Sequence, residues 1–339
     1  MKKTLIALAV LGAFASAASA QSTVTLSGML DAGIRHQGTA TGYDWNMGGA
    51  GSAFNNFTLS GKEDLGGGMN AFFVMNHRFG IQNGTINSAP QADGSTTFFR
   101  NVFVGLGGNF GDVRLGRMLM PLQEMNGNFD PWYGGYTVAS THTGGITATI
   151  RAQQAIYYRS PSMSGFSVHA AIAAANGQLQ AETQNDFGSS APAFATKERP
   201  TGFALNYAAG PLKATVAYDR NYADFKTTGV YGQYNFGVAI LNMQFEDGDG
   251  LTSAAGLKEK VKAFSIAADI PFGAITGKVG YLRYNSNLAG KDATKFGFGG
   301  EYNFSKRTAI YSDIGKSSGD RLSVAAKKTQ FDIGLRHKF

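Results

Sequence analysis

The feature that most constrains this chain is a period-two alternation of apolar and polar residues. It recurs along the sequence and is clearest at residues 24–35, 212–219, 264–270, 295–304 and 330–339. Side chains that alternate in this way point to opposite faces of a β-strand, so the pattern predicts strands with one apolar and one polar face. Helical periodicity is scarce, and no stretch beyond the N-terminal region approaches the 18 continuous apolar residues of a transmembrane helix.

The connections between the predicted strands alternate between short and long. Several short ones carry turn residues, such as Gly210-Pro211 and Pro271-Phe272-Gly273. The short connections lie near residues 64–68, 108–111, 160–164, 208–211, 235–237, 271–273 and 304–307. The long polar ones lie near 37–52, 81–96, 119–150, 175–198, 247–258 and 317–327, and two shorter loops lie near 221–224 and 286–292. Seven turns and eight loops predict sixteen strands.

The apolar faces must either pack on a second sheet or lie against lipid. Charges recur on the polar parity, and the apolar parity ends in aromatic residues beside the short turns. Strands of about 9–12 residues cross a bilayer when tilted by roughly 45°, and a closed barrel pairs every backbone group, as lipid requires. The pattern therefore favours an all-β transmembrane antiparallel β-barrel over a soluble sandwich. The expected interface aromatics are Tyr158, Phe166, Tyr207, Tyr234, Phe236, Phe272, Tyr302 and Phe304.

The N-terminus predicts export. Lys2 and Lys3 precede a short apolar core, and residues 18–20 form a small-residue cleavage site. Residues 1–20 are thus a predicted signal peptide, cleaved after Ala20, and residues 21–339 form one barrel domain. Cleavage removes two lysines and no acids, which lowers the formal net charge from +7 to +5. That excess is too small to predict nucleic-acid binding. The chain has no cysteine, which excludes disulfides and thiolate metal sites, and we expect no metal or cofactor.

Five segments in order carry a family resemblance. They are STVTLSGMLDAGI at 22–34, GKEDLGGGM at 61–69, VGLGGNFGDVRLGR at 104–117, YYRSPSMSGFSV at 157–168 and GLRHKF at 334–339. Together they resemble the Gram-negative general porins, most closely the β-proteobacterial type. The resemblance implies a homotrimer in the cell outer membrane, in contact with its lipids. It further implies a water-filled channel for passive diffusion of small hydrophilic solutes and ions, and no enzymatic activity.

The resemblance also implies that the third long loop folds into the lumen and narrows it. Here that loop is residues 118–150, the longest predicted loop, and it contains no Lys or Arg. A barrel of sixteen strands is wide enough for an aqueous channel unless something fills it. Because selectivity depends on the width of a pore and on the charges across it, this loop is the first place to seek functional residues.

In this family, acids on the third loop face arginines on the barrel wall. The loop acids here are Glu124 and Asp130, the latter in an FDPW segment that resembles the Asp-Pro-aromatic segment of the family. Arg117 and Arg151 match wall arginines of the family. Alternation places Arg151 inward but Arg117 outward, and we expect a β-bulge at Gly116 to turn Arg117 into the lumen.

One position departs from the family pattern. Asn56 stands in the second strand where many porins carry an arginine. Arg35 and Arg78 have lumen parity and could supplement the wall cluster, so the expected pore constriction comprises Arg117, Arg151, Asp130, Glu124, Arg35 and Arg78. The charge of +5 and the scarcity of loop acids predict a mild anion preference.

Two other functions compete with a general porin. An outer-membrane barrel enzyme is disfavoured, because the five histidines are scattered and no catalytic motif is found. A solute-specific channel for aromatic acids or sugars is closer, since Trp132, Tyr133 and Tyr136 could form a sliding surface. The same aromatics could instead anchor the loop to the wall, which we favour.

Overall fold

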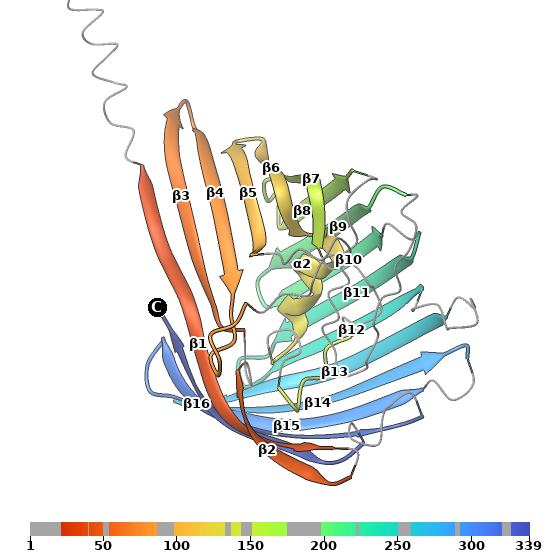
Figure 1. Cartoon of the computed structure of the whole chain (residues 1–339). Coiled ribbons are helices and arrows are strands. Elements are labelled where there is room, and N and C mark those ends of the chain that lie inside the picture. Colours follow the sequence, from red (N-terminus) through yellow and green to blue (C-terminus); the bar gives the residue numbers. More distant parts are fainter. Residues whose placement is uncertain are drawn as a thin grey trace, which may run out of the picture.

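The computed structural model contains one antiparallel sheet that closes on itself (Figure 1). It describes residues 22–39, 41–49, 54–86, 98–132, 137–143, 151–174, 198–221, 224–249, 259–288, 292–320 and 327–339. The predicted signal peptide, residues 1–20, lies outside these ranges. No helix within them is long and apolar enough to cross a bilayer.

Apart from β2 and β3, which both pair with β1, each strand pairs with its neighbour in the chain. The first strands are β1 Thr23–Gly38, β2 Tyr43–Gly49, β3 Asn56–Gly66, β4 Met69–Arg78, β5 Phe99–Gly108, β6 Gly111–Leu119, β7 Arg151–Arg159 and β8 Phe166–Ala173. The others are β9 Thr201–Ala209, β10 Leu212–Arg220, β11 Lys226–Asn235, β12 Ile240–Asp249, β13 Lys260–Phe272, β14 Ile275–Ser286, β15 Ala293–Asn303, β16 Thr308–Ser318 and β17 Gln330–Lys338. All seven predicted short turns are confirmed.

The second wall strand is divided into two segments. β1 pairs through its first half with β3 and through its second half with β2, so β2 and β3 follow one another along the same partner. The seventeen described strand segments therefore make sixteen wall strands, as expected. At the break, Asn55 exchanges hydrogen bonds with the backbone of Asp31, accepting from its N–H at 2.6 Å and donating to its carbonyl at 3.0 Å. The Asn55 side chain thus replaces part of the backbone hydrogen bonding that is missing between β2 and β3.

The expectation of a loop over residues 37–52 was wrong. β1 continues to Gly38, and Tyr43–Gly49 forms β2. The turn between them lies within residues 39–42, and Tyr43, Trp45 and Met47 point outward, each at least half exposed. These three residues alternate with polar or glycine neighbours, so the sequence did contain the strand signal.

The barrel closes between its first and last strands. Met29 to His36 of β1 pair with Lys338 to Phe331 of β17. Beyond this ladder, the backbones of Gly28 and Phe339 exchange two hydrogen bonds of 3.0 Å. A Cβ atom at Gly28 would lie 2.5 Å from the Phe339 ring, so the glycine makes room for the terminal aromatic residue.

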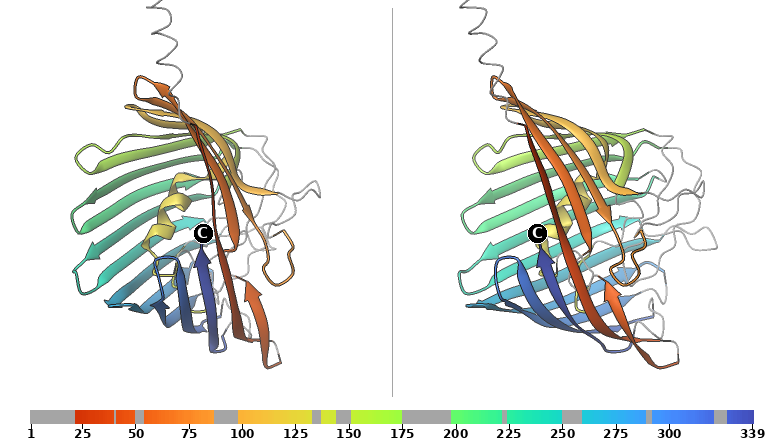
Figure 2. Two further views of the ribbon diagram at one scale, coloured as in Figure 1. Left: turned by 90° about the vertical axis from the view of Figure 1, so that its left-hand side faces the viewer. Right: turned by 60° about the vertical axis from the view of Figure 1, so that its left-hand side comes forward.

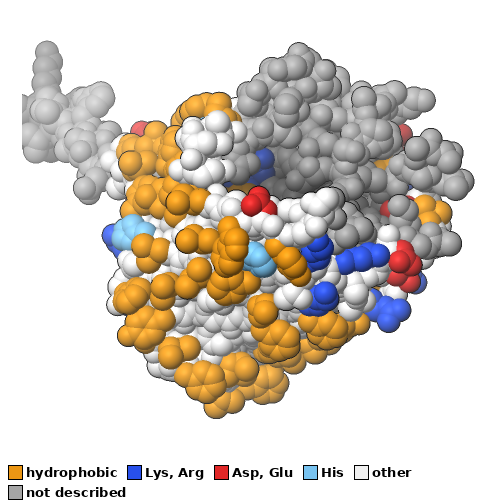
Figure 3. Space-filling model, turned by 60° about the horizontal axis from the view of Figure 1, so that its bottom comes forward, with side chains coloured by type: hydrophobic (Ala, Val, Ile, Leu, Met, Phe, Trp, Pro, Cys, Tyr) orange, Lys and Arg blue, Asp and Glu red, His pale blue; other side chains and the backbone are white. Residues whose placement is uncertain are grey.

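The outer face is apolar, as the alternation predicts. Hydrophobic side chains cover much of the surface in Figure 3, while Lys, Arg, Asp and Glu side chains gather toward its right-hand edge. The predicted interface aromatics are at least partly exposed beside the short turns, and they form pairs such as Phe166–Tyr207 and Tyr302–Phe304, with ring centroids 4.7 and 5.1 Å apart. The charged residues that are buried in the wall strands of this single chain mostly lie on the inner side of the barrel, whereas buried His77 packs against Phe57 of the outer parity.

Candidate channel lining in the barrel lumen

The third long loop folds into the lumen, as expected. It contains α2 (Pro121–Asn126) and the 3-10 helix η1 (Gly127–Phe129), and α2 lies inside the closed sheet against β8–β11 (Figures 1 and 2). Pro121 occupies the first turn of α2, where its missing N–H costs nothing. Apolar packing holds this part of the loop, through a buried cluster of Leu122, Met125, Phe129, Ala204, Ala217 and Tyr231.

Acids on the wall also hold the described parts of the loop. We call the inner face of β10–β17 the anchoring wall. On it, Asp219 accepts from the backbone N–H of Leu122 at 3.3 Å, and Asp332 accepts from that of Val138 at 3.2 Å. Because the loop contains no Lys or Arg, the donors that it offers these two carboxylates are neutral backbone N–H groups.

Glu246 and Gln244 of β12 extend this anchoring. The Thr143 hydroxyl lies 2.9 Å from Glu246 Oε1 and 2.8 Å from Gln244 Oε1, and its single hydrogen is shared between these two acceptors. Gln244 in turn donates from Nε2 to the carbonyl of Phe129 at 2.8 Å. Two distant parts of the loop are thus fixed to one strand.

Trp132 anchors the loop to β16, near the end of the strand order. The indole N–H donates to Asp313 Oδ1 of β16 at 2.8 Å, and the side chain is 1 % exposed. Beside it, Lys278 donates to the carbonyl of Pro131 at 2.8 Å and to Glu301 at 3.2 Å. The preference for Trp132 as an anchor is therefore confirmed. Tyr133 and Tyr136 lie outside the described residues.

The opposite side of the lumen carries buried arginines. We call the inner face of β4–β7 the arginine wall. The pairing of β6 with β7 shifts between Gly116 and Met118, and Gly116 has a φ of 145°. Arg117 lies in this bulge and is 7 % exposed. The predicted β-bulge at Gly116 is confirmed, and the buried position of Arg117 agrees with an inward side chain.

The strand pairing places two more arginines within a few residues of this bulge. Arg151, which is 4 % exposed, pairs with Leu119 and donates from Nε to Asn101 Oδ1 at 2.8 Å. Arg100 was missed by the sequence analysis and is also buried. It occupies a second bulge, where the pairing of β4 with β5 shifts between Asn76 and His77. Strict alternation would turn Arg100 toward lipid, and no glycine marks this second bulge.

Glu124 of α2 faces a cluster on β6–β8. It accepts a hydrogen bond from the Tyr157 hydroxyl and lies 3.5 Å from Arg114 and 3.8 Å from His169. Burial alone would raise the pKa of Glu124. The neighbouring His169, Arg114 and Tyr157 outweigh that effect and lower this pKa to about 2. Glu124 is therefore ionised at neutral pH and ties the helix to the wall.

The remaining expected site residues each have other partners in the barrel. Asp130 is buried and accepts from the Ser140 hydroxyl at 3.0 Å, within the loop itself. Arg35 lies 3.6 Å from Asp332 on the anchoring side, and the Arg78 guanidinium lies 3.5 Å above the ring of Phe54. Only Arg117 and Arg151, among the six expected residues, are brought together by the register of neighbouring strands.

Comparison with known proteins identifies the family. A family model described as "Gram-negative porin" matches residues 7–322. The chain belongs to this family. It is 28 % identical to outer membrane porin protein 32 of Delftia acidovorans and 27 % identical to an outer membrane porin protein of Bordetella pertussis, over the full length of both partners. The relatives are porins of β-proteobacteria.

Solved structures agree with this assignment. An anion-selective porin from Comamonas acidovorans matches with a TM-score of 0.77 and 25 % identity, covering 94 % of this chain and 100 % of the other. OmpT of Vibrio cholerae shares the fold at 17 % identity and a TM-score of 0.67, covering 94 % of this chain and 98 % of the other. The protein is thus an outer-membrane porin, a transport channel and not an enzyme.

Proposed function

We propose that this porin lets small hydrophilic solutes diffuse along the arginine wall, with a mild preference for anions. The observation that carries this proposal is the asymmetry of the lumen. Three buried arginines, Arg100, Arg117 and Arg151, lie within a few residues of one another in register, whereas the described acids of the loop are engaged elsewhere. Glu124 faces Arg114, and Asp130 accepts from Ser140. A relative described as anion-selective supports the sign of the preference.

The constriction is proposed to lie between the loop and the arginine wall. Arg117 and Arg151 are its basic side, with Arg78 on β4 next to the bulge of Arg100 and Arg35 on β1 beside Asp332. Glu124 and Asp130 act mainly by holding the loop in shape, because each has a partner within the protein. Screening over about 8–10 Å in physiological salt limits the influence of these charges to the narrow region.

The functional unit is proposed to be a homotrimer, formed after cleavage behind Ala20. One structure of the same fold is described as a trimer form. The outer faces of β3, β4 and β17 carry a band of large apolar side chains that a second subunit could cover. These are Phe57, Leu59, Phe73, Met75, Phe331, Ile333 and Leu335. Light scattering of the detergent-solubilised protein and N-terminal sequencing of the exported chain test these two points.

The reversal potential of single channels in a KCl gradient tests the selectivity. We expect a potential that favours chloride over potassium by a small factor. A cation-selective potential would refute the proposed role of the arginine wall. Liposome swelling with solutes of rising size tests the solute-specific alternative, since a general channel gives rates that fall smoothly with size and do not saturate.

A further inference from the structure

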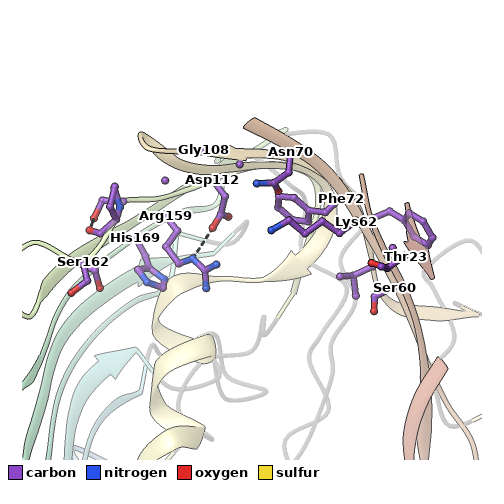
Figure 4. A pocket seen from close by; sticks show the side chains of 18 of the residues that line it. Thr23, Ser60, Lys62, Asn70, Phe72, Gly108, Asp112, Arg159, Ser162 and His169 are labelled. Carbon is purple, nitrogen blue, oxygen red and sulfur yellow. Dashed lines mark hydrogen bonds and ion pairs between the residues drawn. The ribbon is translucent and has the colours of Figure 1, made fainter. Parts of the chain in front are cut away.

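A cavity of about 820 Å³, lined by both polar and apolar groups, opens on the inner face at the end of the barrel that carries the short turns. It lies between β1, β3, β4 and β5 on one side and β6–β8 on the other (Figure 4). The turn that begins at Ser160 forms part of its rim. The cavity is distinct from the region of Arg117 and Arg151, neither of which lines it.

Glycines hollow the wall of this cavity. A Cβ atom at Gly105 would lie 2.4 Å from the Phe72 ring, and one at Gly107 would lie 2.9 Å from Asn70 Oδ1. The side chains of Phe72 and Asn70 therefore lie against bare backbone of β5 instead of standing out into the lumen. This leaves an aromatic ring and an amide on the cavity surface, with open space in front of them.

Two cations face each other across this space. The Lys62 ammonium and the Arg159 guanidinium point toward one another from opposite sides of the cavity in Figure 4. Arg159 donates from Nε to Asp112 Oδ2 at 2.7 Å, and Arg114 donates to the other oxygen of Asp112 at 2.7 Å. The Asp112 carboxylate thus pairs with two guanidinium groups. Within the described part of the chain, Lys62 has no hydrogen bond or ion pair. The cavity retains a positive surplus.

Hydroxyl groups complete the lining. Thr23 pairs with Lys62 and Thr25 pairs with Ser60, so three hydroxyls surround the lysine on the inner face of β1 and β3. Ser162 and Ser167 line the side of Arg159. Hydroxyl and amide groups both donate and accept hydrogen bonds, and a sugar ring packs well on an aromatic face. Such a lining suits a ligand that has many hydroxyls as well as a negative charge.

We propose that this cavity is a binding site for anionic polyols, the chemical class of sugar phosphates and sugar acids. The acidic group lies between Lys62 and Arg159, and the hydroxyls contact Ser60, Thr25 and Asn70. The inference rests on the proposed passage of solutes through the lumen, and it names a class of solute that binds transiently on the way. It adds a site that is separate from the constriction.

Transient block of the chloride current tests this site. Glucose 6-phosphate or gluconate is added to each side of single channels in turn, with glucose and inorganic phosphate as partial ligands. We expect at least one of the two anionic sugars to block at concentrations where glucose and phosphate do not. In the Lys62→Gln variant the half-blocking concentration is expected to rise about tenfold, the value of one hydrogen bond to a charged group.

Lys213→Gln is the matched control. Lys213 is an exposed lysine on the inner side of β10, beside the turn at Gly210, and it lies outside the cavity. An unchanged block in this variant supports the site. An equal loss in both variants, an equal block by phosphate alone, or no block by either anionic sugar would overturn it. The reversal potential is recorded on the same channels, so a failed anion preference is seen separately from a failed cavity.

Discussion

The two sides of the lumen use charge in opposite ways. On the anchoring wall, carboxylates such as Asp219, Asp313 and Asp332 accept hydrogen bonds from the third loop. On the arginine wall, Arg117 and Arg100 lie in β-bulges, and Arg151 lies nearby in register. The anchoring wall makes several of the contacts that hold the loop, Glu124 adds contacts to Arg114 and Tyr157, and the arginine wall is proposed to border the path of the solute.

The difference explains the composition of the loop. A segment that must be held by carboxylates needs donors, and the loop supplies backbone N–H groups, the Trp132 indole and the Thr143 hydroxyl. Lysines or arginines in the same places would be drawn to the anchoring acids and would add positive charge beside the path. The absence of basic residues from residues 118–150 therefore fits a loop that is held by neutral donors.

The largest effect is expected when the anchoring wall loses its aromatic contact. Trp132→Ala removes the hydrogen bond to Asp313 and empties a buried site, at a cost of about 3–5 kcal/mol. We expect a lower unfolding temperature and noisier channels of higher conductance. Trp45→Ala is the control, because Trp45 is 61 % exposed on the outer face. Equal behaviour of the two variants would show that Trp132 does not hold the loop.

The second effect concerns the backbone of the arginine wall. At Gly116, with its φ of 145°, a Cβ atom would lie 2.3 Å from the carbonyl oxygen of Val102. Gly116→Ala should cost about 1–3 kcal/mol and displace Arg117 from the lumen. Thermal unfolding and the reversal potential measure these two consequences.

Gly232→Ala serves as the comparison for that variant. Gly232 lies within β11, and a Cβ atom there has no heavy atom within 4 Å. We expect a nearly unchanged melting temperature and selectivity. If Gly116→Ala also retains both, the bulge is not what orients Arg117.

A smaller effect is expected from single charges. Arg151→Gln should reduce the permeability ratio of chloride to potassium by about two- to fourfold, the screened effect of one charge near the path. Lys316→Gln removes an exposed cation from the outer face and should leave the ratio unchanged. If both variants reduced the permeability ratio of chloride to potassium by the same factor, the selectivity would depend on net charge and not on the arginine wall.

The smallest effect is the pH dependence of α2. The pKa of Glu124 is lowered from 4.5 to about 2, so its stabilising contribution is complete above pH 4.5 and is lost as the pH falls toward 2. The difference in unfolding temperature between the wild type and Glu124→Gln should be largest near neutral pH and should shrink over this range. A difference that stays constant down to pH 2 would contradict the role of the ionised carboxylate.

Much of the fold follows from the sequence, because both determinants are local. Alternation assigns each side chain to lipid or lumen, and residues such as Gly210-Pro211 mark the turns. The bulge at Gly116 could be predicted because an arginine stood on the lipid parity beside a glycine. β2 was missed since it follows β1 after a tight turn and is rich in polar and glycine residues.

The candidate site was less predictable, because its contacts join residues far apart in the chain. Alternation gives no reason to turn Arg100 inward, and only the register of β4 against β5 reveals its bulge. The partners of the loop, such as Asp313 for Trp132 and Asp332 for Val138, are 181 and 194 residues away in sequence. Nothing local encodes such pairs.

The accessibility of single cysteines tests the central claim most directly, since the chain has no native cysteine. Val74→Cys places a thiol on the inner face of β4, and Ala267→Cys places one on the anchoring wall in the cluster with Trp132 and Ala139. The rate of modification by a charged, membrane-impermeant thiol reagent is measured on folded channels. We predict rapid modification at Val74→Cys, with a fall in current, and protection at Ala267→Cys. Rapid modification at Ala267→Cys with protection at Val74→Cys would show that the path runs along the other wall.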